Sequence, residues 1–118
     1  MKRFLNILAA LVAISLCRQT SAAIFNINDG DVAALITAMT TSNVDGEDDT
    51  IELATNGTYT LTVINNGTQN GLPQILSDTG HKLVIHGNGA TLQRSTVLGT
   101  PAFAYLKLTR APILPLTD

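Results

Sequence analysis

The chain has 118 residues, enough for one small domain. Its 14% charged and 4% aromatic residues are fewer than a charge-rich disordered chain or a densely packed enzyme core would carry. The formal net charge of -2 comes without a cluster of Lys and Arg, which disfavours nucleic-acid binding because phosphates are neutralised by such clusters.

The first 23 residues have the pattern of a signal peptide: a basic start, an apolar run from Phe4 to Leu16 and a short segment ending in small residues. Ser21 and Ala23 occupy the -3 and -1 positions, so we expect cleavage after Ala23, or one residue earlier after Ala22. The apolar run is shorter than the roughly 20 residues of a membrane span. We therefore expect a signal-peptide helix, no membrane span after cleavage, and export to the periplasm, cell surface or extracellular medium.

Cleavage would remove the only cysteine, Cys17, and three basic residues, which leaves four basic and nine acidic residues and a formal charge of -5. A chain without cysteine has no disulfide frame, thiol nucleophile or thiolate metal site. Cys17 could also be the lipidated cysteine of a lipoprotein signal, but the residue before such a cysteine is normally small, and here it is Leu16. The mature fold must then be stabilised by regular hydrogen bonding and stacking.

The mature chain opens with a predicted strand and a predicted helix. Residues 24–28 alternate apolar and polar side chains, which is typical of a strand. Residues 32–39 place apolar side chains at i, i+3, i+4 and i+7, which predicts a helix with one apolar face. Asp29 or Asp31 can cap it. A helix of this shape suits a lid over an open core.

The rest of the chain predicts short strands separated by Gly and Asn turns, with a long loop over 64–80. Strand patterns occur at 50–53, 58–63, 81–86, 90–94 and 102–109. In the central pair, Leu83 and Ile85 share one face, and Lys82, Val84 and His86 share the other. Repetition at a spacing of roughly 20 to 30 residues favours a solenoid over a sandwich or meander.

Five segments occur in a distinctive order. They are residues 28–39, 49–53 (DTIEL), 57–61 (GTYTL), 70–75 (NGLPQI) and 85–95 (IHGNGATLQRS). In this order they resemble the N-terminal part of bacterial exported right-handed parallel β-helix proteins, the pectate-lyase-like and polymorphic-outer-membrane-protein-like surface proteins. The resemblance covers about Asn26 to Leu108.

The resemblance implies an all-β fold, the start of a right-handed parallel β-helix with one N-terminal capping α-helix. It divides the chain into a signal peptide (1–23), a cap with the first coils (24–110) and an irregular tail (111–118). Proteins of this kind carry many more coils than the two or three expected here. A truncated or frame-shifted gene is therefore one expectation.

Two motifs resemble ligand sites but have simpler readings. Gly87-Asn88-Gly89 is similar to the opening of a dinucleotide-binding fingerprint, yet Leu92 stands where a third glycine is needed and no helix follows, so a tight turn is expected. Four acidic residues could hold calcium, but their spacing does not match an EF-hand loop, which favours a solvated turn. These four are Asp45, Glu47, Asp48 and Asp49.

His81, His86 and Asp78 suggest a metal or catalytic group, but the two histidines lie on either side of a short strand and no further ligand completes a set. Asn56-Gly57-Thr58 and Asn66-Gly67-Thr68 fit glycosylation acceptors and are better explained as turns. We therefore assign no catalytic, cofactor-binding or metal-binding residue and no cofactor.

The expected function is that of an exported structural or surface module, non-catalytic, either complete or a fragment of a larger surface or secreted protein. Its Thr-rich and Asn-rich outer faces suit contact with carbohydrate or cell-surface components, and its open end suits self-association. The alternative is the N-terminal portion of a β-helical polysaccharide lyase or glycoside hydrolase whose active site lies in downstream coils. A third hypothesis is a complete small periplasmic ligand-binding β-protein.

Overall fold

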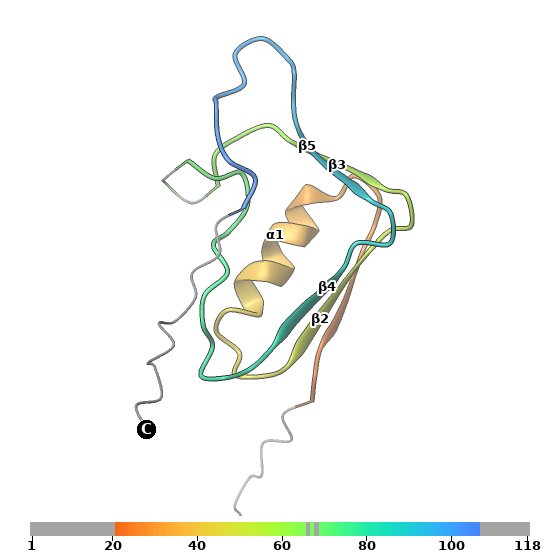
Figure 1. Cartoon of the computed structure of the whole chain (residues 1–118), viewed down its shortest axis with the longest axis vertical. Helices are drawn as coiled ribbons and strands as arrows, with labels where there is room; N and C mark the ends of the chain where they lie inside the picture. The colour runs from red at the N-terminus through yellow and green to blue at the C-terminus, as the bar shows by residue number, and fades with distance from the viewer. Residues whose placement is uncertain (1–20, 66, 68, 107–118) are drawn as a thin grey trace, which may run out of the picture.

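The computed structural model describes residues 21–65, 67 and 69–106, and over these residues the regular secondary structure is mostly strand, with one short helix (Figure 1). Residues 1–20 of the expected signal peptide, Cys17 among them, and the expected tail at 111–118 lie outside the described residues. Over the described part, no helix has the length and apolar character needed to cross a membrane.

The first sheet contains three parallel strands in the order β1 (Ile24–Ile27), β2 (Asp49–Leu53) and β4 (Leu83–His86). Thr50 pairs with Ile24 on one side and with Val84 on the other. The separation along the chain is 26 residues between β1 and β2 and 34 residues between β2 and β4. Parallel pairing excludes the predicted alternative of a simple meander, whose neighbouring strands are antiparallel.

A second sheet pairs β3 (Thr58–Leu61) with β5 (Thr91–Arg94), also in parallel and 33 residues apart. A fourth parallel contact joins Asn70 to Ala104, 34 residues apart. There Gly71 N donates to Ala104 O at 2.8 Å, and Ala104 N donates to Gln69 O at 2.6 Å. Residues 49–82 and the segment that follows them thus lie side by side at three places, and the paired residues are 33 or 34 positions apart in the sequence each time.

The helix α1 (Val32–Thr41) begins at Asp31, whose side chain accepts a hydrogen bond from Ala34 N at 2.9 Å. It continues two residues past the predicted end at residue 39, and the hydroxyls of Thr40 and Thr41 donate hydrogen bonds to carbonyl oxygens one turn earlier. Among the described elements, α1 packs against β1, β2 and β3 and not against β4 or β5. In Figure 1 it lies within the outline traced by the strands and loops, and its contacts leave β4 as the strand of the first sheet without helix cover.

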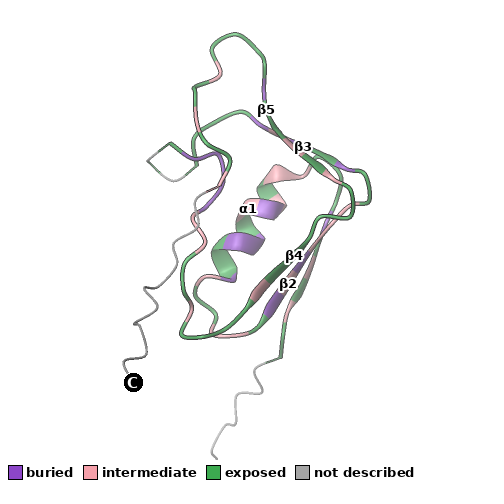
Figure 2. Ribbon diagram, in the orientation of Figure 1, coloured by how far each residue is buried: buried purple, intermediate pink, exposed green. Residues whose placement is uncertain are grey.

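The core lies between the two sheets and the buried side of α1, as the purple segments of Figure 2 show. Its fully buried apolar residues are Ile27, Leu35, Ala38, Met39, Ile51, Tyr59, Leu61 and Leu72. Burial decreases toward the far side of the stack. Ile51 is 0% exposed, whereas Ile85, its partner on the outermost strand, is 38% exposed. The β4 end of the core therefore has less cover than the α1 end.

The predicted strands differ from the structure at their ends, for example at 81–86, where the strand begins at Leu83, and two differences matter for the fold. The strand predicted at 58–63 ends at Leu61. The strand predicted at 102–109 is absent over 102–106, where Ala104 forms the isolated bridge to Asn70, and residues 107–109 lie outside the described residues. The segment after Pro101 pairs with the long loop of the preceding pass and does not add a strand beside β4.

Candidate functional site

The outer face of the three-stranded sheet carries a row of polar side chains. The parallel register places Asn26 beside Glu52, and Glu52 beside His86. Residues paired in this way point to the same face of a sheet. His86 Nδ1 lies 2.6 Å from Glu52 Oε1, and the His86 side chain is 53% exposed. The sheet therefore presents an amide, a carboxylate and an imidazole to solvent.

Asn88 holds Glu52 from the turn that follows β4. Its backbone is left-handed, with φ 47°, a conformation that Asn tolerates better than most residues. From there its amide donates to Glu52 Oε2 at 3.0 Å and to Leu53 O at 2.9 Å. The hydrogen bond from Asn88, followed by the contact with His86, lowers the pKa of Glu52. Glu52 is thus held as a carboxylate that accepts hydrogen bonds, a poor state for a general acid.

An open pocket of about 650 Å³ lies beside this row, between β1, β2 and the turn after β2. Its lining residues are Ile24, Asn26, Ile27, Asn28, Glu52, Leu53, Ala54, Thr55 and Asn88. Amide, hydroxyl and carboxylate groups can exchange hydrogen bonds with the hydroxyls of a sugar. No aromatic side chain stands among these described lining residues, so stacking on a sugar ring is not provided there.

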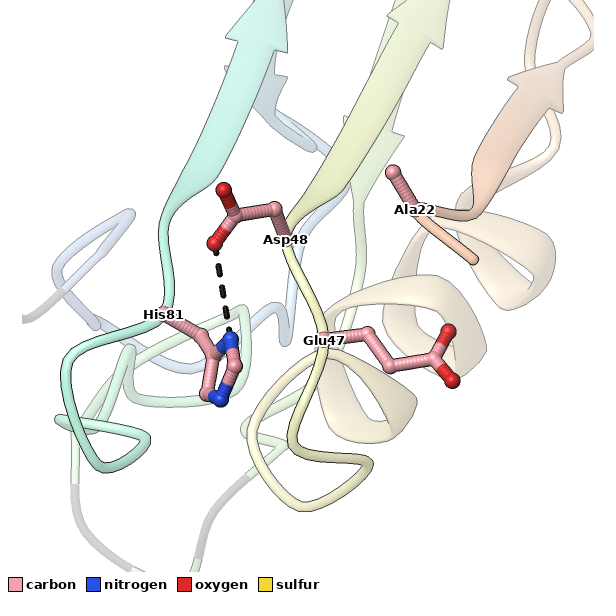
Figure 3. Close-up of a pocket in the computed structure, with 4 residues that line it drawn as sticks. All are labelled: Ala22, Glu47, Asp48 and His81. Atoms are coloured by element: carbon pink, nitrogen blue, oxygen red, sulfur yellow. Dashed lines mark ion pairs between the residues drawn. The ribbon is translucent and has the colours of Figure 1, made fainter. Parts of the chain in front are cut away.

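A second pocket, of about 440 Å³, lies at the opposite end of the strands, where β1 and β2 begin and the chain enters β4 (Figure 3). His81 Nδ1 lies 3.5 Å from Asp48 Oδ1, while the Glu47 carboxylate points away from this pair. Asp48 also accepts a hydrogen bond from Lys82 N at 2.9 Å. That bond lowers the pKa of Asp48, burial opposes it, and His81 adds a smaller lowering effect.

The structure separates the residues that the sequence had suggested as a metal or catalytic group. His86 contacts Glu52 and His81 contacts Asp48, whereas Asp78 Oδ2 accepts a hydrogen bond from Gly46 N at 2.8 Å. Across residues 21–65, 67 and 69–106, no group of three or more His, Cys, Asp or Glu side chains is placed to hold a metal ion. Each of these residues therefore acts within a local pair.

The prediction of a solvated acidic turn is wrong for Asp49. Asp45 and Asp48 are exposed and Glu47 is partly exposed, but Asp49 is 2% exposed. The reason is its position as the first residue of β2, where alternation turns its side chain to the same inner face as Ile51. A buried carboxylate is thus part of this segment.

The two glycine motifs behave as turns. Gly87-Asn88-Gly89 is followed by the strand β5, and Ala90 N donates to Gly87 O at 2.7 Å, which confirms the tight turn. Asn56-Gly57 forms the equivalent turn one pass earlier, with Asn56 at φ 55°. Asn56 N donates to Asn88 O at 3.0 Å, so the two turns stack. Asn66 and Thr68 of the other acceptor motif lie outside the described residues.

The link between Glu52 and Asn88, which are 36 residues apart, was not predicted from the sequence. A signal was available, since Thr50-Ile51-Glu52 and Val84-Ile85-His86 each precede an Asn-Gly turn after a few residues. Aligning these two stretches predicts that Glu52 and His86 are neighbours. Comparison of the chain with protein-family models, curated proteins and solved structures found no match.

Proposed function

We propose that the described chain is the capped N-terminal end of an exported right-handed parallel β-helix with a structural, non-catalytic role. The observation that carries this proposal is the separation of 33 or 34 residues at three of the four described parallel contacts, the exception being β1 with β2 at 26 residues. In a solenoid, successive coils place equivalent strands side by side, so paired strands are separated by the same number of residues at every side of the coil. The right-handed sense follows the strong preference of parallel crossover connections.

The unequal ends of the stack support a capping role. Helix α1 covers the β1 end, while the β4 end leaves the inward-facing Ile85 38% exposed. An uncovered strand edge offers unpaired backbone groups to another strand. In this proposal the β4 end is covered by further coils or by a second copy of the chain.

The polar row on the outer sheet face supports contact with carbohydrate or cell-surface components. Its amide groups can hydrogen-bond to sugar hydroxyls. Because no aromatic side chain is found among the described residues that line the pocket, we expect each contact to be weak and the overall affinity to rise when the site is repeated along a stack. Hydrolysis of a glycoside by the usual route needs two carboxylates across the bond. The described outer row contributes one, Glu52, with both oxygens engaged, so no observation here favours the enzyme alternative.

Disulfide trapping in the exported protein tests the coil arrangement, because the mature chain contains no cysteine. Thr60 and Gln93 are register partners whose side chains bond at 3.0 Å, so Thr60→Cys with Gln93→Cys should oxidise readily. The control, Thr58→Cys with Gln93→Cys, shifts one partner two residues along the strand to about 8 Å and should oxidise poorly. Equal trapping of both pairs, or retention of the leader inside the cell, would contradict the proposal.

Affinity electrophoresis through gels containing dextran or polygalacturonate tests the carbohydrate contact. The mature charge of -5 should repel the anionic polymer, so we expect retardation by dextran. Asn26→Ala with Thr55→Ala should reduce it, whereas Thr96→Ala, on an exposed loop, should not. If neither polymer retards the native chain, the outer face does not bind sugars of these kinds.

A further inference from the structure

Asp49 is a buried carboxylate with few hydrogen-bond partners to offset the loss of hydration. Its side chain is 2% exposed, and Oδ1 accepts one hydrogen bond, from Ala23 N at 3.3 Å. Among the described residues, Oδ2 has no hydrogen-bond partner. Burial raises the pKa of Asp49, the nearby Ser42 hydroxyl opposes this, and Asp45 adds to it. A buried charge of this kind is unfavourable unless a cation or several donors face it.

The groups around Asp49 do not supply that cation. Ser42, at the end of α1, donates its hydroxyl to Ala38 O, and Asp45 brings a second negative charge from the following loop. On the β4 side, the backbone carbonyl of Lys82 accepts a hydrogen bond from Asp49 N at 2.8 Å. The described ion pairs involve two histidines with Asp48 and Glu52, and none involves Asp49.

Ala23 is fixed at the boundary between this carboxylate and solvent. Its carbonyl oxygen accepts a hydrogen bond from Thr50 N at 2.9 Å, and its own N–H donates to Asp49 Oδ1. The preceding residue, Ala22, is exposed and lines the open pocket of Figure 3 together with Glu47, Asp48 and His81. The backbone nitrogen of Ala23 therefore lies between a buried carboxylate and a pocket that carries further negative charge.

We propose that export processing cleaves the chain between Ala22 and Ala23 and that the α-ammonium so formed pairs with the buried carboxylate of Asp49. This inference rests on the proposed export. A signal peptidase hydrolyses the Ala22–Ala23 peptide bond with one water molecule, whose hydroxyl goes to the Ala22 carbonyl carbon and whose hydrogen goes to Ala23 N. The new amine then takes up a proton from solvent.

The ammonium group suits this position better than the peptide N–H does. It has three donors in place of one, so it can reach both Asp49 oxygens and direct the third donor to the pocket that contains Glu47. A charge-assisted pair is shorter and stronger than the bond from a neutral amide. Cleavage after Ala23 would instead remove both the donor to Asp49 and the acceptor of Thr50 N. The structure thus selects one of the two sites that the sequence allows.

The first test reads the N-terminus of the full chain after export with its own leader from a bacterial host. Intact mass and N-terminal sequencing should identify Ala23 as the first residue. A protein that keeps its leader inside the cell overturns the proposed export itself. An exported protein that begins at Ile24, or at any other residue, overturns this inference and leaves the export proposal intact.

The second test measures the pairing by NMR titration of the α-amine in a chain that begins at Ala23, released from a cleavable N-terminal fusion. The amine pKa should lie at least about one unit above the ordinary value near 8. Asp49→Asn should remove this increase, whereas Asp48→Asn, in the same pocket but exposed, should lower it less. An ordinary amine pKa, in a folded or an unfolded chain, overturns the pairing.

Thermal unfolding gives a readout of the same pair. A raised amine pKa means that the stabilisation is complete below the unfolded-state pKa and is lost as pH rises through the folded-state pKa. At pH 7, retention of Ala22 should lower the unfolding midpoint by roughly 5 °C, and in the Asp49→Asn background the extra residue should have no such effect. Equal losses in both backgrounds would show that the extension acts without Asp49 and overturn the pairing.

Discussion

The hydroxyl of Tyr59 donates a hydrogen bond to the carbonyl oxygen of Ile27 at 3.0 Å, across 32 residues of chain. The same hydroxyl accepts a hydrogen bond from Ala54 N at 3.0 Å. Tyr59 is 0% exposed and lies on β3, so one side chain joins the end of β1, the turn after β2 and the second sheet. This contact fixes the corner between the two sheets from inside.

Removal of that hydroxyl by Tyr59→Phe should lower the free energy of unfolding by about 1 kcal/mol. The loss stays modest because Ala54 N also donates to Ile27 O at 3.1 Å, so neither backbone group is left without a partner. Urea unfolding monitored by circular dichroism measures the change. Tyr105→Phe, at a side chain that is 48% exposed, is the control and should leave the midpoint unchanged. A loss above about 3 kcal/mol would mean that the corner rearranges.

Gly71 lies where a larger residue does not fit. A Cβ built there would come within 2.5 Å of Phe103 Cε2 and 2.7 Å of Leu61 Cδ1. Gly71→Ala should therefore destabilise the fold by about 1 to 3 kcal/mol through overpacking. Gly87→Ala is the matched control because nothing lies within 4 Å of its Cβ position. Equal unfolding midpoints for the two variants would contradict the packing of Phe103 against the loop.

Acidification tests the arrangement around Glu52. Because the folded-state pKa of Glu52 is lowered, its contribution to stability is present above the ordinary pKa of an unfolded-state glutamate and is lost as pH falls through the folded-state pKa. Asn88→Gly removes the amide and keeps a residue that tolerates the left-handed backbone. The Glu52 pKa, followed by NMR of its side-chain carbonyl carbon, should then rise. An unchanged value would assign the effect to His86 alone.

The uncovered end of the core predicts association between copies of the chain. Ile85→Lys adds a charge at the inner position of β4 and should reduce association measured by analytical ultracentrifugation, because lysine blocks strand edges and apolar ends. Val84→Lys adds the same charge to the outer face of the same strand. A larger effect at Val84 would indicate contact through the sheet face and contradict stacking end to end.

Local patterns predicted the individual elements well and their partners poorly. The helix followed from the spacing of Leu35 and Met39, and β2 followed from the alternation of Ile51 and Leu53, since both depend on nearest neighbours in sequence. The burial of Asp49 depends on which face of β2 meets α1, and periodicity does not report this for a polar residue at the start of a strand.

The contact of Ala104 with Asn70 was beyond the sequence analysis for a related reason. Segment 102–106 alternates like a strand, but alternation does not specify a partner. In the candidate site as well, the local pattern predicted the face of a residue but not its neighbour on the next strand. The sequence pattern placed His86 on the face opposite Leu83 and Ile85, but its adjacency to Glu52 follows from the 34-residue register, which neither the expected spacing nor an alignment of the two Asn-Gly turns gives.

The position of α1 between β1 and β2 has an evolutionary consequence. In the proposed β-helix, the unit that repeats in register would run from Asp49 to Lys82, and the helix lies before it. A duplication of residues 49–82 would lengthen the stack by one strand spacing, about 4.8 Å, without disturbing the covered end. A duplication that began at Ile24 would copy the helix into the middle of the stack, where no end exists for it to cover. Lineages of such a gene should therefore vary in length after Leu53 and hold the segment before it constant.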